Sequence, residues 1–272
     1  MTKLPLGKVG LLSPLVPPRP GGQTAVMTFA VIADIHGNAD ALAAVLEDMQ
    51  GFGVTQAVNL GDHFSGPLDA AGTAELLMAR DFVSIRGNHD RWLLEQDPAD
   101  MGPSDLAAFR QLPPEALDWL RALPATRRPF EGVFMCHGTP TSDLAYWLER
   151  LDAQGQPRAA TLAEVEQEAG LVTEGLILCA HTHIPRIVRL GDGRVVLNPG
   201  SVGCPAYDDD HPVFHVMQTG TPNASYALVD RAAAGWQVSF RSVPYDAGRM
   251  VRMAEEAGRP DWARAVGTGW LT

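Results

Sequence analysis

The sequence has few cysteines, and no two of them form a C-x-x-C pair. Its 272 residues include only three, Cys136, Cys179 and Cys204. An odd number of widely spaced cysteines argues against a disulfide framework and against a zinc site built from thiolates. We therefore interpret all three as small buried residues, and we expect a reducing compartment, the cytoplasm.

Long apolar runs and long basic runs are also missing. No stretch of the chain is apolar enough to span a bilayer, so we expect no membrane contact. The net charge is −11 at pH 7, and there is no run of Lys or Arg to offset it locally. Such a protein repels the backbone of DNA or RNA, so we expect no long nucleic acid as a partner.

Two common catalytic motifs are absent as well. The chain contains neither the G-x-S-x-G turn of serine hydrolases nor the phosphate-binding P-loop. A covalent serine mechanism and ATP-driven work are therefore not indicated.

The first 26 residues differ in composition from the rest of the chain. They carry Lys3 and Lys8 but are interrupted by several prolines, and they lack the apolar stretch and the cleavage site of a signal peptide. We interpret residues 1–26 as a flexible arm and residues 27–272 as a single domain. Met27 directly precedes the first strong strand, and the sequence leaves open whether Met1 or Met27 is the true start.

Apolar patterns predict alternating strands and helices in the first two thirds of the chain. This alternation is typical of βαβ units and an α/β fold. Strands are expected at 28–33, 56–60, 82–85, 133–136 and 176–179, and helices at 39–50 and 71–79. Residues from about 91 to 128 are predicted to form a helical excursion broken by prolines. A hairpin (186–190 with 194–197), an antiparallel pair (226–230 with 237–243) and two short helices (247–257 and 261–266) should follow.

Polar clusters follow five of the predicted strands. They are Asp34-Ile35-His36, Gly61-Asp62, Gly87-Asn88-His89-Asp90, His137-Gly138 and His181-Thr182-His183. Ligand sites form outside the carboxyl ends of parallel strands, so these side chains can converge. On extended backbone, residues i and i+2 point to the same side, so Asp34 with His36, and His181 with His183, can reach one site or two adjacent ones.

Each cluster alone could be an ordinary turn, but five in order are hard to explain as unrelated turns. Together they supply carboxylate, imidazole and amide ligands without a thiolate. Such a set suits manganese, iron, zinc or nickel.

The order D-x-H, G-D, G-N-H-D, H and H-x-H resembles the calcineurin-like metallophosphoesterase superfamily over roughly residues 27–245. The segment Asn198-Pro199-Gly200-Ser201-Val202-Gly203 is similar to the small bacterial and archaeal phosphodiesterase branch. The segment after Gly61-Asp62 lacks the D-R-G of the protein serine/threonine phosphatases. Ala180 stands where the family usually has glycine, which would matter if the backbone φ were positive there.

The resemblance implies a fold and a site. The fold is a four-layer αββα sandwich, in which two mixed β-sheets are flanked by helices and a dimetal site lies at the C-terminal ends of the strands. Asp34, His36 and His183 would hold one divalent ion, Asn88, His137 and His181 the other, and Asp62 would bridge them. The catalytic residues would be His89, near the substrate phosphate, and Asp90, which would orient it. Manganese is the expected metal, with iron, zinc or nickel as alternatives.

A two-metal site predicts hydrolysis by a metal-bound hydroxide. Two divalent ions about 3.5–4 Å apart can share a water molecule and lower its pKa toward neutrality. Their charge exceeds that of Asp34, Asp62 and one hydroxide, so an acidic protein can still attract a phosphate ester at this point. We expect small phosphodiesters or nucleotide-like phosphates as substrates, and the sequence does not indicate the oligomeric state.

Other polar residues allow two interpretations each. Asn88, His89, Arg86, Asp143 and Tyr146 are the candidates for substrate binding. Arg86 could instead form a salt bridge, and Tyr146 and Trp147 could belong to the core or to a lid. His63 is expected outside the ligand set. Asp208-Asp209-Asp210-His211 is either a solvated loop or a flap near the site.

Three alternative functions use the same pattern. They are a phosphomonoesterase, a protein phosphatase, and an inactive metal-bearing module that binds other proteins. The retromer subunit that resembles this family is such a module and lacks the histidine of G-N-H-D, whereas this chain keeps His89.

Overall fold

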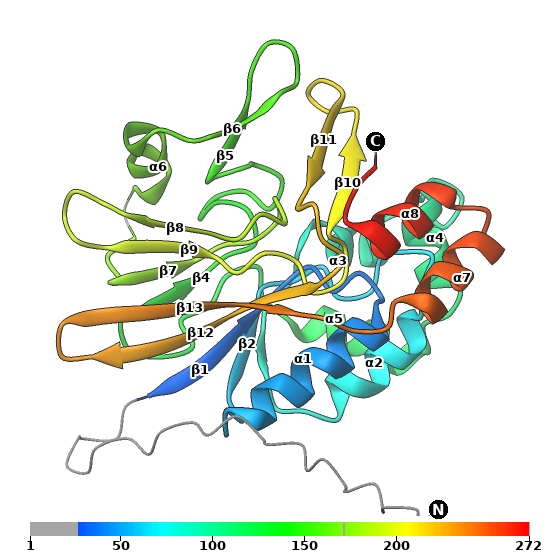
Figure 1. Ribbon diagram of the computed structural model, residues 1–272, viewed down its shortest axis with the longest axis horizontal. Helices are drawn as coiled ribbons and strands as arrows, with labels where there is room; N and C mark the ends of the chain where they lie inside the picture. The colour runs from blue at the N-terminus through cyan, green and yellow to red at the C-terminus, as the bar shows by residue number, and fades with distance from the viewer. Residues whose placement is uncertain (1–26, 171, 272) are drawn as a thin grey trace, which may run out of the picture.

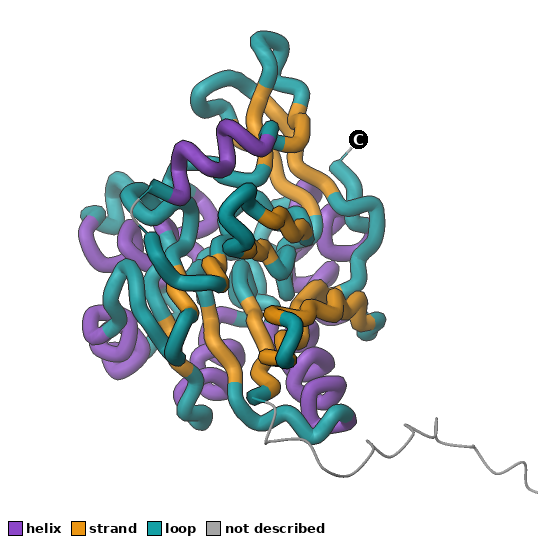
Figure 2. Tube along the Cα trace, turned by 90° about the vertical axis from the view of Figure 1, so that its left-hand side faces the viewer, coloured by secondary structure: helices purple, strands orange, loops and turns teal. Residues whose placement is uncertain are grey.

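The fold consists of two mixed β-sheets that stack face to face, with helices on their outer sides (Figure 1). The computed structural model describes residues 27–170 and 172–271, so the predicted N-terminal arm lies outside the described residues. In Figure 2 the strands run through the middle of the molecule and the helices lie around them. The predicted four-layer α/β architecture is confirmed.

The first sheet has five strands in the order β13-β12-β1-β2-β3. Strands β1 (Thr28–Ile32), β2 (Ala57–Asn59) and β3 (Val83–Ser84) are parallel. Strands β12 (Ala224–Ala232) and β13 (Gly235–Val243) complete it as an antiparallel pair, with Phe29 of β1 opposite Val229 of β12.

The second sheet has four strands in the order β4-β7-β9-β8. Strands β4 (Val133–Met135), β7 (Leu176–Leu178) and β9 (Val195–Asn198) are parallel, and β8 (Arg186–Arg189) pairs antiparallel with β9. The β8–β9 hairpin is the one that the sequence predicts. The five predicted polar clusters follow β1, β2 and β3 of the first sheet and β4 and β7 of the second.

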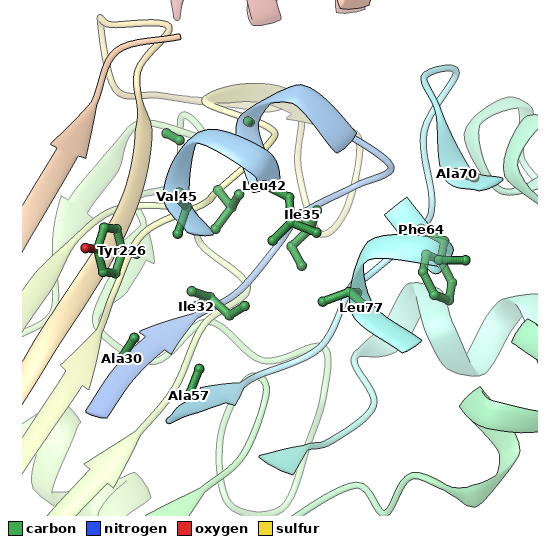
Figure 3. Close-up of a cluster of buried hydrophobic side chains, with 14 of the residues drawn as sticks. Ala30, Ile32, Ile35, Leu42, Val45, Ala57, Phe64, Ala70, Leu77 and Tyr226 are labelled. Atoms are coloured by element: carbon green, nitrogen blue, oxygen red, sulfur yellow. The ribbon is translucent and has the colours of Figure 1, made fainter. Parts of the chain in front are cut away.

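The alternation of side chains along β1 separates two cores. Phe29 and Val31 point into the layer between the sheets, where they meet residues of β4, β7 and β9. Ala30 and Ile32 face helices α1 (Ala39–Gly51) and α2 (Ala70–Met78), which cover the outer side of the first sheet. Figure 3 shows Ile32 beneath Leu42 of α1. Helix α6 (Leu162–Ala169) covers the outer side of the second sheet.

The helical excursion consists of three short helices. They are α3 (Asn88–Glu95), α4 (Pro103–Phe109) and α5 (Pro114–Ala122). Helices α4 and α5 each begin with a proline, which suits the first helical turn because proline needs no hydrogen-bond acceptor there. Helix α3 contacts α4 and α5, so the excursion packs beside the G-N-H-D motif instead of pointing away from it.

Two hairpins were not predicted. Strands β5 (Glu149–Leu151) and β6 (Pro157–Ala159) form one, and β10 (Ala206–Asp209) and β11 (His215–Gln218) form the other. The acidic segment 208–211 therefore lies on a hairpin, beside helix α8 (Pro260–Thr268), which follows α7 (Gly248–Glu256). Within the described ranges, no helix is long and apolar enough to cross a membrane.

Leu42 tests the importance of the core between α1 and the first sheet. The side chain is fully buried, so Leu42→Ala should lower the free energy of unfolding by about 2–5 kcal/mol. Leu162→Ala is the matched control, because Leu162 is 47% exposed and its loss should cost less than about 0.5 kcal/mol. Chemical denaturation of both variants measures the difference, and equal losses would contradict this assignment of the core.

Candidate metal centre

The two sheets are joined by hydrogen bonds at the carboxyl ends of their strands. His137, after β4, donates from Nδ1 to the carbonyl oxygen of Leu60, after β2, at 2.8 Å. Within the first sheet the Asp34 amide donates to the Gly61 carbonyl at 3.0 Å, and within the second the Ala180 amide donates to that of His137 at 2.7 Å. The polar clusters that follow the two sheets therefore meet at one place.

Asp34, His36 and His183 form the first group of donor atoms. The Nε2 atoms of His36 and His183 face each other at 3.3 Å, and His183 Nε2 lies 3.6 Å from Asp34 Oδ1. Both Nδ1 atoms are already used: that of His36 donates to the Ser65 carbonyl at 2.8 Å and that of His183 to the Cys204 carbonyl at 2.6 Å. Each Nε2 therefore presents a lone pair to the other.

A cation between the rings would stabilise this arrangement of lone pairs. Burial lowers the pKa of His36 to about 4 and also lowers that of His183, so both imidazoles are neutral at pH 7. Asp34 is fully buried, and neither of its carboxylate oxygens has a hydrogen-bond partner in the described part of the chain. A buried carboxylate without a partner is costly, and a bound cation would remove that cost. Histidines whose other nitrogen donates to a carbonyl are typical metal ligands.

Asp62, His137 and His181 form the second group. His137 Nε2 lies 3.2 Å from Asp62 Oδ2 and 3.1 Å from Asn88 Oδ1. His181 uses Nε2 to donate to the Leu144 carbonyl at 3.1 Å, which leaves Nδ1 as its ligand atom. Burial lowers the pKa of His137, but the charge of Asp62, its hydrogen bond with that carboxylate and the charge of Asp34 raise it more, to about 10. A second cation at this point would replace that proton.

Asp62 lies between the two groups. Its Oδ2 is 3.2 Å from His137 Nε2 and 3.9 Å from His36 Nε2. Its Oδ1 accepts a hydrogen bond from the backbone amide of His89 at 3.0 Å, which fixes the carboxylate. All seven predicted ligands are thus brought together, and Asp62, a member of the second group, also lies within 4 Å of His36 in the first group.

The sequence predicts extended backbone at these ligands, but five of them have a left-handed backbone instead. Five non-glycine residues have positive φ among those the structure describes, and all five are predicted ligands: Asp34, His36, Asp62, His181 and His183. Left-handed conformations are strained for such residues and concentrate at functional sites. Asp34 and His36 do lie in one group, but they do not reach it from extended backbone. Ala180 has no positive φ, so the missing glycine costs nothing there.

The prediction that Asp90 orients His89 is wrong. Asp90 accepts hydrogen bonds from the amides of Asp62 (2.8 Å), His63 (3.0 Å) and Gly87 (2.9 Å). It also accepts one from His63 Nδ1 at 2.7 Å. Asp90 therefore holds the ligand-bearing loops in place. His63 is fully buried outside the ligand set, and its ring lies 5.0 Å from that of Trp119.

His89 is instead held by Asp105, from helix α4. The Nδ1–H of His89 donates to Asp105 Oδ1 at 2.8 Å, and Ser65 Oγ lies 3.1 Å from the same nitrogen. Burial lowers the pKa of His89, but Asp62 and Asp105 raise it more, so the imidazolium is favoured. The sequence offered one signal for this contact, an acid within the helical excursion, but nothing in it distinguished Asp105 from its acidic neighbours.

A cleft of about 1140 Å³ opens above the two groups. Asn88, His89 and Tyr146 line it, as the sequence predicts, and so do Asp208–Asp210. Arg86 and Asp143, two predicted substrate-binding residues, are not part of its lining. Asp143 instead accepts a hydrogen bond from the Nε of Arg91 at 2.7 Å, and Arg86 follows β3 outside the cleft. Trp147 lies in the core and donates to the Val165 carbonyl at 3.0 Å, so it cannot contact substrate.

Two neighbouring donor groups with a carboxylate within 4 Å of both, beside a histidine–aspartate pair, are typical of metal-dependent phosphate-ester hydrolases. Comparisons with known proteins agree with this class. Residues 27–222 match the family described as the calcineurin-like phosphoesterase superfamily domain. The chain belongs to this superfamily.

Individual relatives are similar to the chain over most of its length. The uncharacterized protein MJ0912 of Methanocaldococcus jannaschii is 25% identical over 256 residues, which cover 86% of this chain and 94% of the relative. The crystal structure of a metallophosphoesterase from Sphaerobacter thermophilus is 24% identical, with a TM-score of 0.70 over 90% of this chain and all of the other. That of the hypothetical protein PH1004 from Pyrococcus horikoshii OT3 is 21% identical, with a TM-score of 0.68 over 90% and 99%. At these identities the two solved structures support the fold.

Asp62→Ala tests the bridging position. The substitution removes an oxygen donor from both groups, so ion content should fall from two per chain to less than one, as measured by elemental analysis after gel filtration. Asp118→Ala, which removes a carboxylate that is 74% exposed on α5, should leave the ion content unchanged. Two ions retained by the Asp62 variant would refute the bridge.

Proposed function

We propose that the protein hydrolyses small phosphodiesters or nucleotide-like phosphates with the help of two divalent metal ions. Manganese is the first candidate for the metal. The observation that carries the proposal is that the Asp62 carboxylate lies within 4 Å of a histidine from each donor group. His89 lies beside them on the floor of the cleft. Family membership implies metal-dependent hydrolysis of phosphate esters, and the substrate is the proposed part.

The metal ions, when bound, supply positive charge that polarises the phosphate and makes a water molecule a better nucleophile. The chain itself supplies the remaining chemistry. His89, held at Nδ1 by Asp105, keeps Nε2 for the substrate. In the protonated form this nitrogen can stabilise negative charge on the phosphoryl oxygens and donate a proton to the leaving oxygen.

The donor set supports the proposed metals, and the cysteines support the proposed location. Nitrogen and oxygen ligands suit manganese, iron, zinc or nickel, and Cys204, which lines the cleft, has a raised thiol pKa because it is buried. The three cysteines are free and buried, which fits a reducing compartment such as the cytoplasm. We infer a small phosphate ester as the partner and no long nucleic acid, because the net charge is −11.

Direct assay of the manganese-loaded protein tests the proposal. Bis(p-nitrophenyl) phosphate should be hydrolysed with a higher kcat/KM than p-nitrophenyl phosphate. Faster hydrolysis of the monoester would favour a phosphomonoesterase. No hydrolysis of either, with two ions bound, would contradict an enzymatic role and favour a metal-bearing binding module.

Three substitutions separate catalysis from metal binding. His89→Ala should keep both ions and lower kcat by about 10²- to 10⁴-fold, because it removes a general acid. Asp105→Asn should also keep both ions and lower kcat by about 10- to 100-fold, because His89 loses its ionic partner. Asp90→Asn should instead reduce ion content, because an amide cannot accept all four hydrogen bonds.

The comparison of Asp105 with Asp90 decides between two roles. Wild-type turnover of the Asp105 variant, or a metal-replete Asp90 variant with low kcat, would return the orienting role to Asp90. Elemental analysis and steady-state kinetics on the same preparations provide both readouts.

A further inference from the structure

Four aromatic side chains surround the donor groups, and each contacts a different histidine. The ring centroids of Trp92 and His89 are 4.7 Å apart, and those of Trp262 and His36 are 6.0 Å apart. On the other side, Tyr207 lies 4.6 Å from His183, and Tyr146 lies 5.0 Å from His181. All four aromatic residues line the cleft.

The two tyrosines are occupied by contacts within the protein. The Tyr146 hydroxyl lies 2.8 Å from that of Tyr207 and 2.7 Å from His215 Nε2. His215 Nδ1 donates to the Val213 carbonyl at 2.8 Å, so its Nε2 accepts the proton of Tyr146. Tyr207 also contacts the His181 carbonyl at 3.2 Å. This network fixes the tyrosines as supports of the ligand histidines.

The two tryptophans differ in position and in packing. Trp92 comes from α3, Trp262 from α8, and both are only partly buried in the wall of the cleft. Trp262 rests on Gly66, where a Cβ would come within 3.1 Å of the indole. The guanidinium of Arg259, neutralised by Asp261, lies 5.9 Å from the same ring. Trp262 is therefore a flat surface held in place before any substrate binds.

Trp262 also lies outside the part of the chain that matches the family. The match ends at residue 222, whereas α8 begins at Pro260. The metal ligands all lie within the match, so Trp262 belongs to a part of the cleft wall beyond the matched residues.

The mouth of the cleft is acidic. Asp208, Asp209 and Asp210 line it, and none of them takes part in a salt bridge among residues 27–170 and 172–271. The two arginines of the lining are compensated, Arg150 by Glu168 and Arg259 by Asp261. The floor can attract a phosphoryl group once cations are bound, but the mouth repels additional phosphates.

We propose that the substrate is a nucleotide with a single phosphoryl group, whose base stacks on the indoles of Trp92 and Trp262. This inference rests on the proposed function and adds the substrate class. Stacking on aromatic side chains accepts any base, and a cleft of about 1140 Å³ has room for a nucleoside. The acidic mouth excludes nucleoside diphosphates, triphosphates and longer chains.

Matched substrates test the base without any substitution. The methyl phosphodiesters of adenosine 5′-monophosphate and of ribose 5-phosphate contain the same ester bonds and differ only in adenine. The adenosine compound should have a kcat/KM about 10- to 100-fold higher, mainly through KM. Adenosine 5′-monophosphate and ribose 5-phosphate themselves form a second pair, which applies if the enzyme prefers monoesters. Equal values within the pair that is hydrolysed would overturn the inference and leave the proposed function standing, whereas no hydrolysis of either pair or of bis(p-nitrophenyl) phosphate would overturn both.

Substitutions then assign the effect to the indoles. Trp262→Ala and Trp92→Ala should each raise KM for the adenosine compound by about tenfold and leave the ribose compound nearly unchanged. Trp262→Phe keeps a ring and should retain most of the preference. Trp270→Ala is the control, because Trp270 packs on Gly220 at the same end of the chain and does not line the cleft. Quenching of tryptophan fluorescence by adenosine 5′-monophosphate, but not by ribose 5-phosphate, gives a readout independent of activity. Unchanged KM and no quenching would overturn the stacking role.

The acidic mouth has its own test. Replacing Asp208, Asp209 and Asp210 together by asparagine should raise kcat/KM for adenosine 5′-diphosphate relative to the monophosphate by about tenfold at low salt. An unchanged ratio, or a wild-type preference for the diphosphate, would contradict selection for a single phosphoryl group.

Discussion

A buried carboxylate between two sets of histidines is the constraint on which this structure depends. Asp62 is almost completely buried and lies within 4 Å of His36 and of His137, which belong to different donor groups. A charged group so far from water is tolerated only with opposite charge and hydrogen bonds around it. Two bound cations would supply that charge, and the backbone amide of His89 already donates to the carboxylate. The two stacked sheets bring these partners together at the carboxyl ends of their strands.

The surrounding backbone is built to keep that carboxylate in one place. A Cβ at Gly87 would lie 2.1 Å from Asp62 Oδ1, so only glycine fits beside it. The ligand residues with positive φ cost about 1–3 kcal/mol each, a strain that the sheets on both sides must offset. The donors of each group face one another, and the hydrogen bond from His89 to Asp105 fixes the orientation of the His89 ring.

Much of the fold and the ligand set could be predicted because the signals are local. Each parallel strand is a short apolar run followed directly by its polar cluster, and both cores follow from the alternation in β1. The hairpin β5–β6 could not be predicted in this way, since β6 is fully exposed and has no apolar alternation. Asp105 and Trp262 reach the site through packing of α4 and α8, and tertiary packing leaves no periodic signal in the sequence. The left-handed backbone of five ligands could not be predicted, because φ does not follow from residue type for Asp and His.

The most direct test of this account is anomalous diffraction from crystals grown with manganese. The account predicts two peaks per chain. One lies between Asp34, His36 and His183, the other between Asn88, His137 and His181, and the Asp62 carboxylate contacts both. A single peak, or two peaks that do not share Asp62, would contradict the central claim.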